Sequence, residues 1–260
     1  MRNHFFIPYT GNKREEVDSI YNAIIKNNSL NNIETIIEPY CGSSAMSYYI
    51  STLHPNKYKY ILNDNNKLLI ELYKIFSNED TIKEFIIKIN NLCFDKDLKF
   101  ITKIQYELLK KEQTVESYFI SNKFYKMRCG TYPLDEILVP LDYDKVMKTP
   151  IINFLKNENI TFSSDDAIEI IQKNNNKESL ILCDPPYLMA CNDFYNNSNV
   201  NIYEWIYYNN KILINTVLIL ENNWIIQLLF KDITTKTIYE KRYNGLKKKV
   251  VDHVVAFYNS

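Results

Sequence analysis

Two patterns of apolar residues alternate along this chain. Short uninterrupted apolar runs predict buried strands, whereas apolar residues at helical spacing predict amphipathic helices. The runs predict strands at residues 34–38, 58–62, 159–162, 180–183 and 211–217, and the helical spacing predicts helices that start near residues 17, 46, 68, 168 and 221. Two further β-rich runs, 234–243 and 250–258, flank Asn244-Gly245, a dipeptide typical of hairpins. The alternation predicts an α/β protein whose sheet ends in an antiparallel hairpin.

The periodicity changes between residues 78 and 156. Helical spacing dominates there, and lysines are interleaved with aromatic residues. We therefore predict a main domain of residues 1–77 and 157–260, interrupted by a mainly helical domain of residues 78–156. A solvated helical surface accounts for the same charges equally well.

Polar residues mark where the expected helices begin and how the strands connect. Asn65 can cap the third helix, and Ser163 or Ser164 can cap the fourth. Residues 190–201 form an Asn-rich stretch that is long for a minimal connection, so we predict a functional or mobile loop there. The connection between Tyr187 and the strand expected at 211–217 looks short for a full crossover helix.

The composition excludes several classes of protein. The 31 basic and 31 acidic side chains balance, so binding to a polyanion would need a local basic patch. The 5 cysteines include no Cys-x-x-Cys pair and the 3 histidines are scattered, which argues against a disulfide framework or a zinc site. With no signal-like or membrane-spanning run, we expect a soluble, intracellular, cytoplasmic protein. The bias toward Asn, Ile, Lys and Tyr is typical of an AT-rich genome, and we expect a bacterial or viral source.

The strand expected at 180–183 runs directly into Asp184-Pro185-Pro186-Tyr187. Both prolines fix φ, so this turn is stiff and presents a carboxylate, a carbonyl and an aromatic ring. The carboxyl end of a strand is where open α/β sheets bind ligands. That set of groups suits a flat heterocycle with an exocyclic amine. The alternative is an ordinary turn at the end of a strand.

Glycine is rare in this chain. It occurs only 4 times, so each glycine is expected where a side chain is not tolerated. Gly42 follows the strand at 34–38 in a small-residue turn before a helix, as in the first unit of a Rossmann-like nucleotide-binding fold. Asp64 lies about twenty residues further on, where such folds place an acid that holds ribose hydroxyls.

Four motifs follow one another in order along the chain. They are Tyr9-Thr10-Gly11-Asn12-Lys13, Glu38-Pro39-Tyr40-Cys41-Gly42, Asn63-Asp64 and Asp184-Pro185-Pro186-Tyr187. The series resembles the Dam-type (D12 class, alpha group) DNA N(6)-adenine methyltransferases over nearly the whole chain, from Ile7 to Asn259. The resemblance implies S-adenosylmethionine as cofactor and double-stranded DNA as substrate, as in restriction–modification, without a metal or a membrane. It also makes the domain at 78–156 a target-recognition domain. As oligomeric state we expect a monomer or a weak dimer.

The resemblance also implies a set of cofactor-binding residues: Tyr9, Gly11, Lys13, Pro39, Tyr40, Cys41, Gly42, Ser43, Asp64, Asp165, Asp166 and Asp184. Lys13 would lie near the methionine carboxylate, and Asp64 would hold the ribose hydroxyls. Asp166, or Asp165 if the register slips, would face the amino group of the cofactor's adenine. For Asp166, a plain acid at a helix N-terminus is the alternative.

The implied catalytic residues are Asp184, Pro185, Pro186 and Tyr187. An adenine flipped out of the duplex would donate its amino hydrogens to the Asp184 carboxylate and the Pro185 carbonyl, and would stack on Tyr187. The implied DNA-binding residues are Lys123, Tyr125, Lys126, Arg128 and Tyr132.

The sequence departs from this family at two places. Ser43 replaces the second glycine of the cofactor loop. If Gly130 marks the turn of the recognition lobe, Tyr125 and Met127 stand where the family has an arginine and an asparagine. Tyrosine cannot make the bidentate pair with guanine that arginine makes, which argues against GATC as the target. Two alternatives therefore stay open: a decayed module that binds cofactor or DNA without catalysis, and methylation of RNA or of protein glutamine.

Overall fold

The computed structural model describes residues 5–7, 13–27, 30–94, 111–124, 140–186, 200–231, 236–243 and 249–258 of the 260-residue chain. The chain divides into two compact units. Unit 1 comprises Met1–Asn12 and Asn66–Phe162, and unit 2 comprises Lys13–Asn65 and Ser163–Ser260. These units divide the chain at other residues than the domains predicted from the sequence, which were bounded at residues 78 and 156. The predicted domain bounds stay a prediction. None of the helices within the described ranges is long and apolar enough to cross a membrane.

Within the described residues the strands form one 7-stranded sheet in the order β3-β2-β1-β4-β5-β7-β6. They are β1 (Thr35–Glu38), β2 (Lys59–Asn63), β3 (Ile160–Ser163), β4 (Ser179–Cys183), β5 (Thr216–Glu221), β6 (Lys236–Tyr243) and β7 (Lys249–Tyr258). β1 pairs in parallel with β2 and β4, with Ile37 opposite both Ile61 and Ile181, and β4 pairs in parallel with β5. β7 runs antiparallel to β5 and to β6. The α/β sheet expected from the sequence is confirmed.

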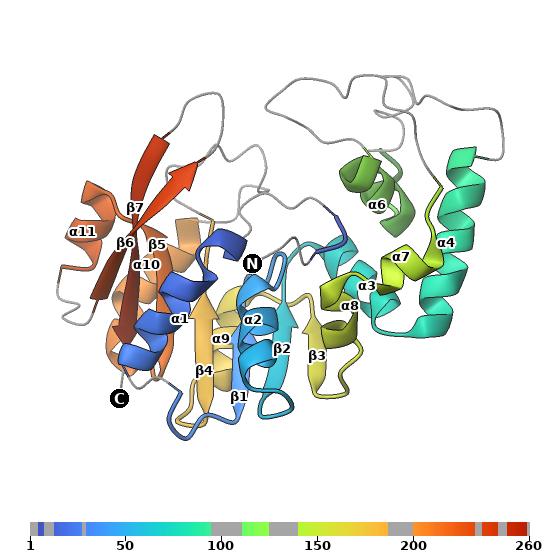
Figure 1. Cartoon of the computed structure of the whole chain (residues 1–260). Coiled ribbons are helices and arrows are strands. Elements are labelled where there is room, and N and C mark those ends of the chain that lie inside the picture. The colour runs from blue at the N-terminus through green and yellow to red at the C-terminus, as the bar shows by residue number, and fades with distance from the viewer. Residues whose placement is uncertain are drawn as a thin grey trace. The chain divides into compact units, whose positions relative to one another are not determined.

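Helices cover both faces of the sheet in unit 2 (Figure 1). α1 (Val17–Lys26) and α2 (Ala45–Leu53) lie on the side toward the viewer, and α9 (Ala167–Asn174) and α10 (Val200–Asn209) lie behind the strands. Behind the sheet, Ile171 and Ile206 join Ile37, Ile181 and Leu218 in one buried apolar cluster. Burial of each such side chain contributes about 1.5–3 kcal/mol. This packing fixes the strand ends that carry the polar residues of the site.

The last parallel strand begins later than predicted, so the strand expected at 211–217 is wrong over residues 211–215. Asn210–Ile212 forms a short 3₁₀ helix (η3), and β5 begins only at Thr216. The side chain of Asn175 holds the connection: its Oδ1 accepts from the Ile214 N–H at 2.7 Å, and its Nδ2 donates to the Ile212 carbonyl at 2.7 Å. The apolar residues Ile212, Leu213 and Ile214 therefore belong to the connection before β5 and not to the strand. The helix that follows, α11, spans Trp224–Leu229.

The connection from β4 to β5 contains a helix, contrary to prediction. α10 begins at Val200, inside the stretch predicted as a polar loop. Its Ile202, Tyr203 and Ile206 are buried against the sheet. Asparagines around these three residues obscure their helical spacing in the sequence, and the late start of β5 leaves room for the helix.

Unit 1 is mainly helical and contains α3 (Lys67–Phe76), α4 (Glu79–Phe94), α6 (Val115–Phe124), α7 (Tyr143–Met147) and α8 (Pro150–Leu155). Its core is aromatic. Phe6 stacks on Phe76 with ring centroids 4.2 Å apart, and Phe119 meets Phe85 edge-on at 5.3 Å. Asn66, rather than the predicted Asn65, caps α3, because its side chain accepts from a backbone N–H in the first turn.

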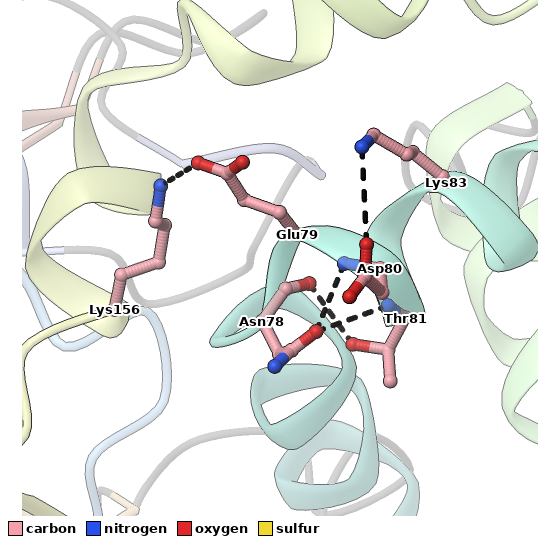
Figure 2. A network of polar contacts seen from close by, with 6 residues as sticks. All are labelled: Asn78, Glu79, Asp80, Thr81, Lys83 and Lys156. Atoms are coloured by element: carbon pink, nitrogen blue, oxygen red, sulfur yellow. Dashed lines mark hydrogen bonds and ion pairs between the residues drawn. The ribbon is translucent and has the colours of Figure 1, made fainter.

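Polar side chains gather at the exposed start of α4 (Figure 2). The Asn78 Oδ1 atom caps the helix by accepting from the backbone N–H groups of Asp80 and Thr81, at 2.9 and 3.3 Å. Beside this cap, Lys156 forms an ion pair with Glu79. The cluster joins the start of α4 to the residue after α8 within unit 1.

Candidate active site

Lys13 and Asp184, which the sequence places at opposite ends of the predicted site, form a direct ion pair. Lys13 opens η1 (Lys13–Glu15), and Asp184 is the first residue after β4. The Lys13 Nζ atom lies 2.6 Å from Asp184 Oδ2, and the two side chains are only 7% and 21% exposed. Burial by itself would lower the pKa of Lys13, but the carboxylates of Asp184 and Glu16 outweigh it and raise the pKa above its ordinary value. Lys13 is therefore a firmly protonated cation.

Glu38, the last residue of β1, adds a buried carboxyl group beside this pair. Its Oε1 accepts a 2.7 Å hydrogen bond from the Ser47 N–H in the first turn of α2. The pKa of Glu38 is raised to about 7, chiefly by burial; the hydrogen bonds from Ser47 lower it, nearby Asp184 raises it and Lys13 lowers it. Sequence analysis assigned Glu38 no role, although an acid at the end of a buried strand is itself a signal of function.

Glu16 completes the charged group at Lys13. It is buried, and its Oε2 accepts a 2.7 Å hydrogen bond from the Tyr239 hydroxyl on β6. Its charge is one of the causes that raise the pKa of Lys13. Glu16 and Tyr239 are 223 positions apart, so no local pattern in the sequence could have linked them.

The turn after β1 is built around Gly42. Gly42 has φ 47°, a left-handed conformation that glycine adopts freely, and its N–H donates to Asp64 Oδ2 at 3.0 Å. The second left-handed residue is Ser44, with φ 50°, whose N–H donates to the Cys41 carbonyl at 2.6 Å. Ser43 stands where the Dam-type family has its second glycine. It does not have a left-handed backbone, so a residue with a side chain is tolerated at this position.

The side-chain amide of Asn63, at the end of β2, ties neighbouring loops together. Its Nδ2 donates to the carbonyls of Pro39 and Asp165 at 2.9 and 3.1 Å, and its Oδ1 accepts from the Asp165 N–H at 2.9 Å. Asp64 follows directly and is buried. These contacts bring Pro39, Asp64 and Asp165 to one edge of the sheet, as the motif order predicts for parallel strands.

Asp166 is the N-cap of α9. Its Oδ1 accepts from two backbone N–H groups in the first turn, at 2.8 and 3.3 Å. The predicted cap at Ser163 or Ser164 is thus wrong, because Asp166 stands immediately before the helix; Ser163 instead donates to the Asp165 carboxylate. The contacts of Asp166 are those of an acid at a helix N-terminus, which is the alternative that the sequence left open.

The remaining side chains of the β1 turn are neutral. Tyr40 is half-buried, and its pKa is raised by burial first and by Cys183 and Asp166 next. Burial also raises the pKa of the thiols of Cys41 and Cys183. Such thiols are inert, which excludes them as nucleophiles.

The Asp-Pro-Pro turn is described as far as Pro186. Pro185 is buried and Pro186 is half-buried. The Pro186 carbonyl accepts a 3.0 Å hydrogen bond from the Tyr203 hydroxyl on α10. Sequence analysis missed Tyr203, because no helix was predicted between the loop at 190–201 and the strand at 211–217.

Several predicted residues lie outside the described part of the chain: Tyr9, Gly11, Tyr125, Lys126, Arg128, Tyr132 and Tyr187. Lys123 is described, and its Nζ donates to the Phe6 carbonyl at 2.7 Å within unit 1. Among the described residues there is no group of three or more His, Cys, Asp or Glu that could hold a metal ion.

The comparison with protein-family models supports the resemblance seen in the motifs. The family model of the D12 class N6 adenine-specific DNA methyltransferases matches residues 9–132. No curated protein sequence matches the chain.

Three of the solved structures that are similar at low identity are the following. The Escherichia coli protein yhhF, which bears a methyltransferase name, has a TM-score of 0.36 and 9% identity over 98% of this chain and 92% of its own. The N-terminal domain of human METTL16 in complex with SAH has a TM-score of 0.40 and 8% identity, over 98% of this chain and 72% of its own. A SAM-dependent O-methyltransferase from Thermotoga maritima has a TM-score of 0.35 and 10% identity, over 94% of this chain and 66% of its own.

The family match begins at the first motif and includes Lys13, Glu38, Gly42 and Asp64. Asp184 lies beyond its end, and the structure places Asp184 against Lys13. Over residues 9–132, just under half of its length, the chain matches the D12 class N6 adenine-specific DNA methyltransferases, and the family resemblance predicted from its motifs is confirmed.

Proposed function

We propose that this protein is a site-specific DNA adenine methyltransferase that transfers a methyl group from S-adenosylmethionine to the exocyclic amine of a flipped-out adenine. The observation that carries the proposal is the Lys13–Asp184 contact at 2.6 Å. It joins the first and last of the four motifs at the carboxyl ends of the strands, where α/β sheets bind ligands.

The residues at this edge fit the proposed cofactor. The buried Gly42 has a left-handed backbone, so a Cβ atom would be strained there and would fill space beside Asp64. A carboxylate at the end of β2 suits ribose hydroxyls, and the three N–H donors of Lys13 can hold a second carboxylate besides Asp184. When bound, S-adenosylmethionine supplies an electrophilic methyl group on a positively charged sulfur.

The chain's own residues would act on the adenine. The Asp184 carboxylate and the Pro185 carbonyl are acceptors for the two amino hydrogens, and accepting them directs the nitrogen lone pair away from the ring. The stiff turn holds both acceptors in place before the base arrives, which supplies positioning without motion. Base flipping delivers the amine, since an adenine stacked in a duplex cannot reach the site.

The test is a methyl-transfer assay with the purified full chain. Radiolabelled S-adenosylmethionine and unmethylated duplex DNA should yield N6-methyladenine, identified by mass spectrometry after nuclease digestion. Asp184→Ala should reduce the rate by about 100-fold or more, because it removes an acceptor used in the transition state. Asp144→Ala, at an exposed position on α7, is the matched control and should keep the wild-type rate.

Three results would overturn parts of the proposal. Full activity of Asp184→Ala would remove the turn from the mechanism. Methyl transfer to RNA of the same sequence, but not to DNA, would assign an RNA substrate. Calorimetry without heat of S-adenosylmethionine binding would leave a module that has lost the enzyme's function.

A further inference from the structure

The Asp-Pro-Pro turn has few backbone N–H groups with which to form hydrogen bonds. Pro185 and Pro186 have no backbone N–H, so two successive residues cannot donate to neighbouring loops. A turn of this kind can be held from outside only through its carbonyl oxygens and its flanking residues. Two described contacts do so: the ion pair of Asp184 with Lys13, and the 3.0 Å hydrogen bond from the Tyr203 hydroxyl to the Pro186 carbonyl.

Tyr203 is itself fixed in the core. It lies on α10, is 4% exposed, and belongs to the buried cluster that includes Ile206 of the same helix and Cys183 of β4. A buried ring in a packed cluster has one rotamer, so the position of its hydroxyl is set by the fold. The hydrogen bond is partly buried, and removing the Tyr203 hydroxyl would take away the donor that the Pro186 carbonyl uses.

We propose that Tyr203 is a positioning residue for the proposed methyl transfer: its hydroxyl fixes the Asp-Pro-Pro turn, and so the Asp184 carboxylate and the Pro185 carbonyl, in the geometry that receives the adenine amine. The Pro186 carbonyl is engaged by the protein, whereas the carbonyl one residue earlier serves the substrate. The helix after the turn thereby becomes part of the catalytic apparatus without touching the substrate.

The test compares Tyr203→Phe with Tyr207→Phe. Tyr207 lies one turn further along α10 and is 46% exposed, so the control removes a hydroxyl from the same helix without touching the turn. Tyr203→Phe should lower kcat by about tenfold, the order expected for one hydrogen bond used in positioning. The affinity for S-adenosylmethionine should stay within about twofold of wild type, since a catalytic effect without a binding effect marks positioning. Tyr207→Phe should match wild type in both.

A second measurement does not depend on activity. Hydrogen–deuterium exchange of the backbone amides of Cys183 and Asp184 should become several-fold faster in Tyr203→Phe and stay unchanged in Tyr207→Phe, because a loosened turn opens more often. A variant that only melts at a lower temperature, with wild-type kcat and wild-type exchange well below that temperature, would overturn the inference.

The kinetic part rests on the proposed function, and the two failures can be told apart. If the wild-type protein transfers no methyl group, the proposed function fails, while hydrogen exchange still decides whether Tyr203 fixes the turn. If the wild type is active and Tyr203→Phe has wild-type kcat, the proposed function stands and the role of Tyr203 is rejected.

Discussion

Two lysine–carboxylate pairs, one in each compact unit, have the same chemistry and different surroundings. In unit 2 the side chains of Lys13 and Asp184 are 7% and 21% exposed. In unit 1 those of Lys156 and Glu79 are 29% and 50% exposed and join the start of α4 to the residue after α8 (Figure 2). Both pairs are in direct contact, so burial rather than distance distinguishes them.

Burial changes what each pair contributes. The charges of an exposed pair keep most of their hydration when they separate, so breaking the pair costs little. Removing one partner of a buried pair leaves the other charge without water or counter-ion, which is strongly destabilising. Glu16 and Glu38 increase this difference, because they add acidic groups around the single ammonium of Lys13. Charges held in this way are typical of functional sites.

The largest expected effect is that of breaking the buried pair. Lys13→Met should lower the free energy of unfolding of unit 2 by about 3–4 kcal/mol at pH 7, since it leaves Asp184 next to other carboxyl groups without its cation. Both tryptophans of the chain, Trp205 and Trp224, belong to unit 2, so urea unfolding followed by tryptophan fluorescence reports on this unit.

A double-mutant cycle separates the pair from other effects of the substitution. Asp184→Asn combined with Lys13→Met should recover a large part of the loss, because no unpaired charge then remains. A coupling free energy near zero would show that the pair is no stronger than an exposed one, and the comparison between the units would fail.

The second expected effect depends on pH. The pKa of Glu38 is about 7 in the folded protein and 4.5 ordinarily, so the folded state binds the extra proton between these values. The contribution of this group to the free energy of unfolding therefore falls as the pH rises through that window, by an amount on the order of 2–3 kcal/mol at pH 8. Glu38→Gln keeps an acceptor for the Ser47 N–H and should be more stable than wild type at pH 8, with little difference at pH 4.

The control for this prediction is Glu34→Gln, at an exposed glutamate just before the same strand. It should show the same pH dependence of unfolding as the wild type. An identical pH dependence in Glu38→Gln would mean that the buried carboxyl group does not titrate near neutrality.

The sequence was sufficient for those parts of the fold and site that depend on local patterns. Apolar runs locate β1, β2, β3 and β4 to within a residue or two, because a buried strand has to be apolar. The motifs identify Lys13 and Asp184, since a cation beside a rare glycine and a carboxylate before two prolines each have few structural explanations. Asp184 follows the parallel strand β4, whereas Lys13 lies in η1, so their contact is learned only from the structure.

The other parts depend on contacts that no local pattern contains. The Asn175 side chain determines where β5 begins, and it lies far from Ile212 and Ile214 in the sequence. Tyr239 holds Glu16 from another strand at the far end of the chain. The Tyr203 ring packs in the core while its hydroxyl reaches the Pro186 carbonyl, 17 positions earlier in the sequence. Tertiary contacts select among local alternatives in each case.

The smallest expected effect is that of breaking the exposed pair. Lys156→Gln should leave the unfolding of unit 1 unchanged within error, because the Glu79 side chain is half-exposed and the pair is screened by water and salt. Helical circular dichroism during urea unfolding is the measurement. Asn78→Ala provides a positive control at the same place: it removes the cap of α4 and should cost about 1 kcal/mol. A loss in Lys156→Gln as large as that of the cap would show that this surface pair stabilises the unit, and burial would no longer explain the difference between the two pairs.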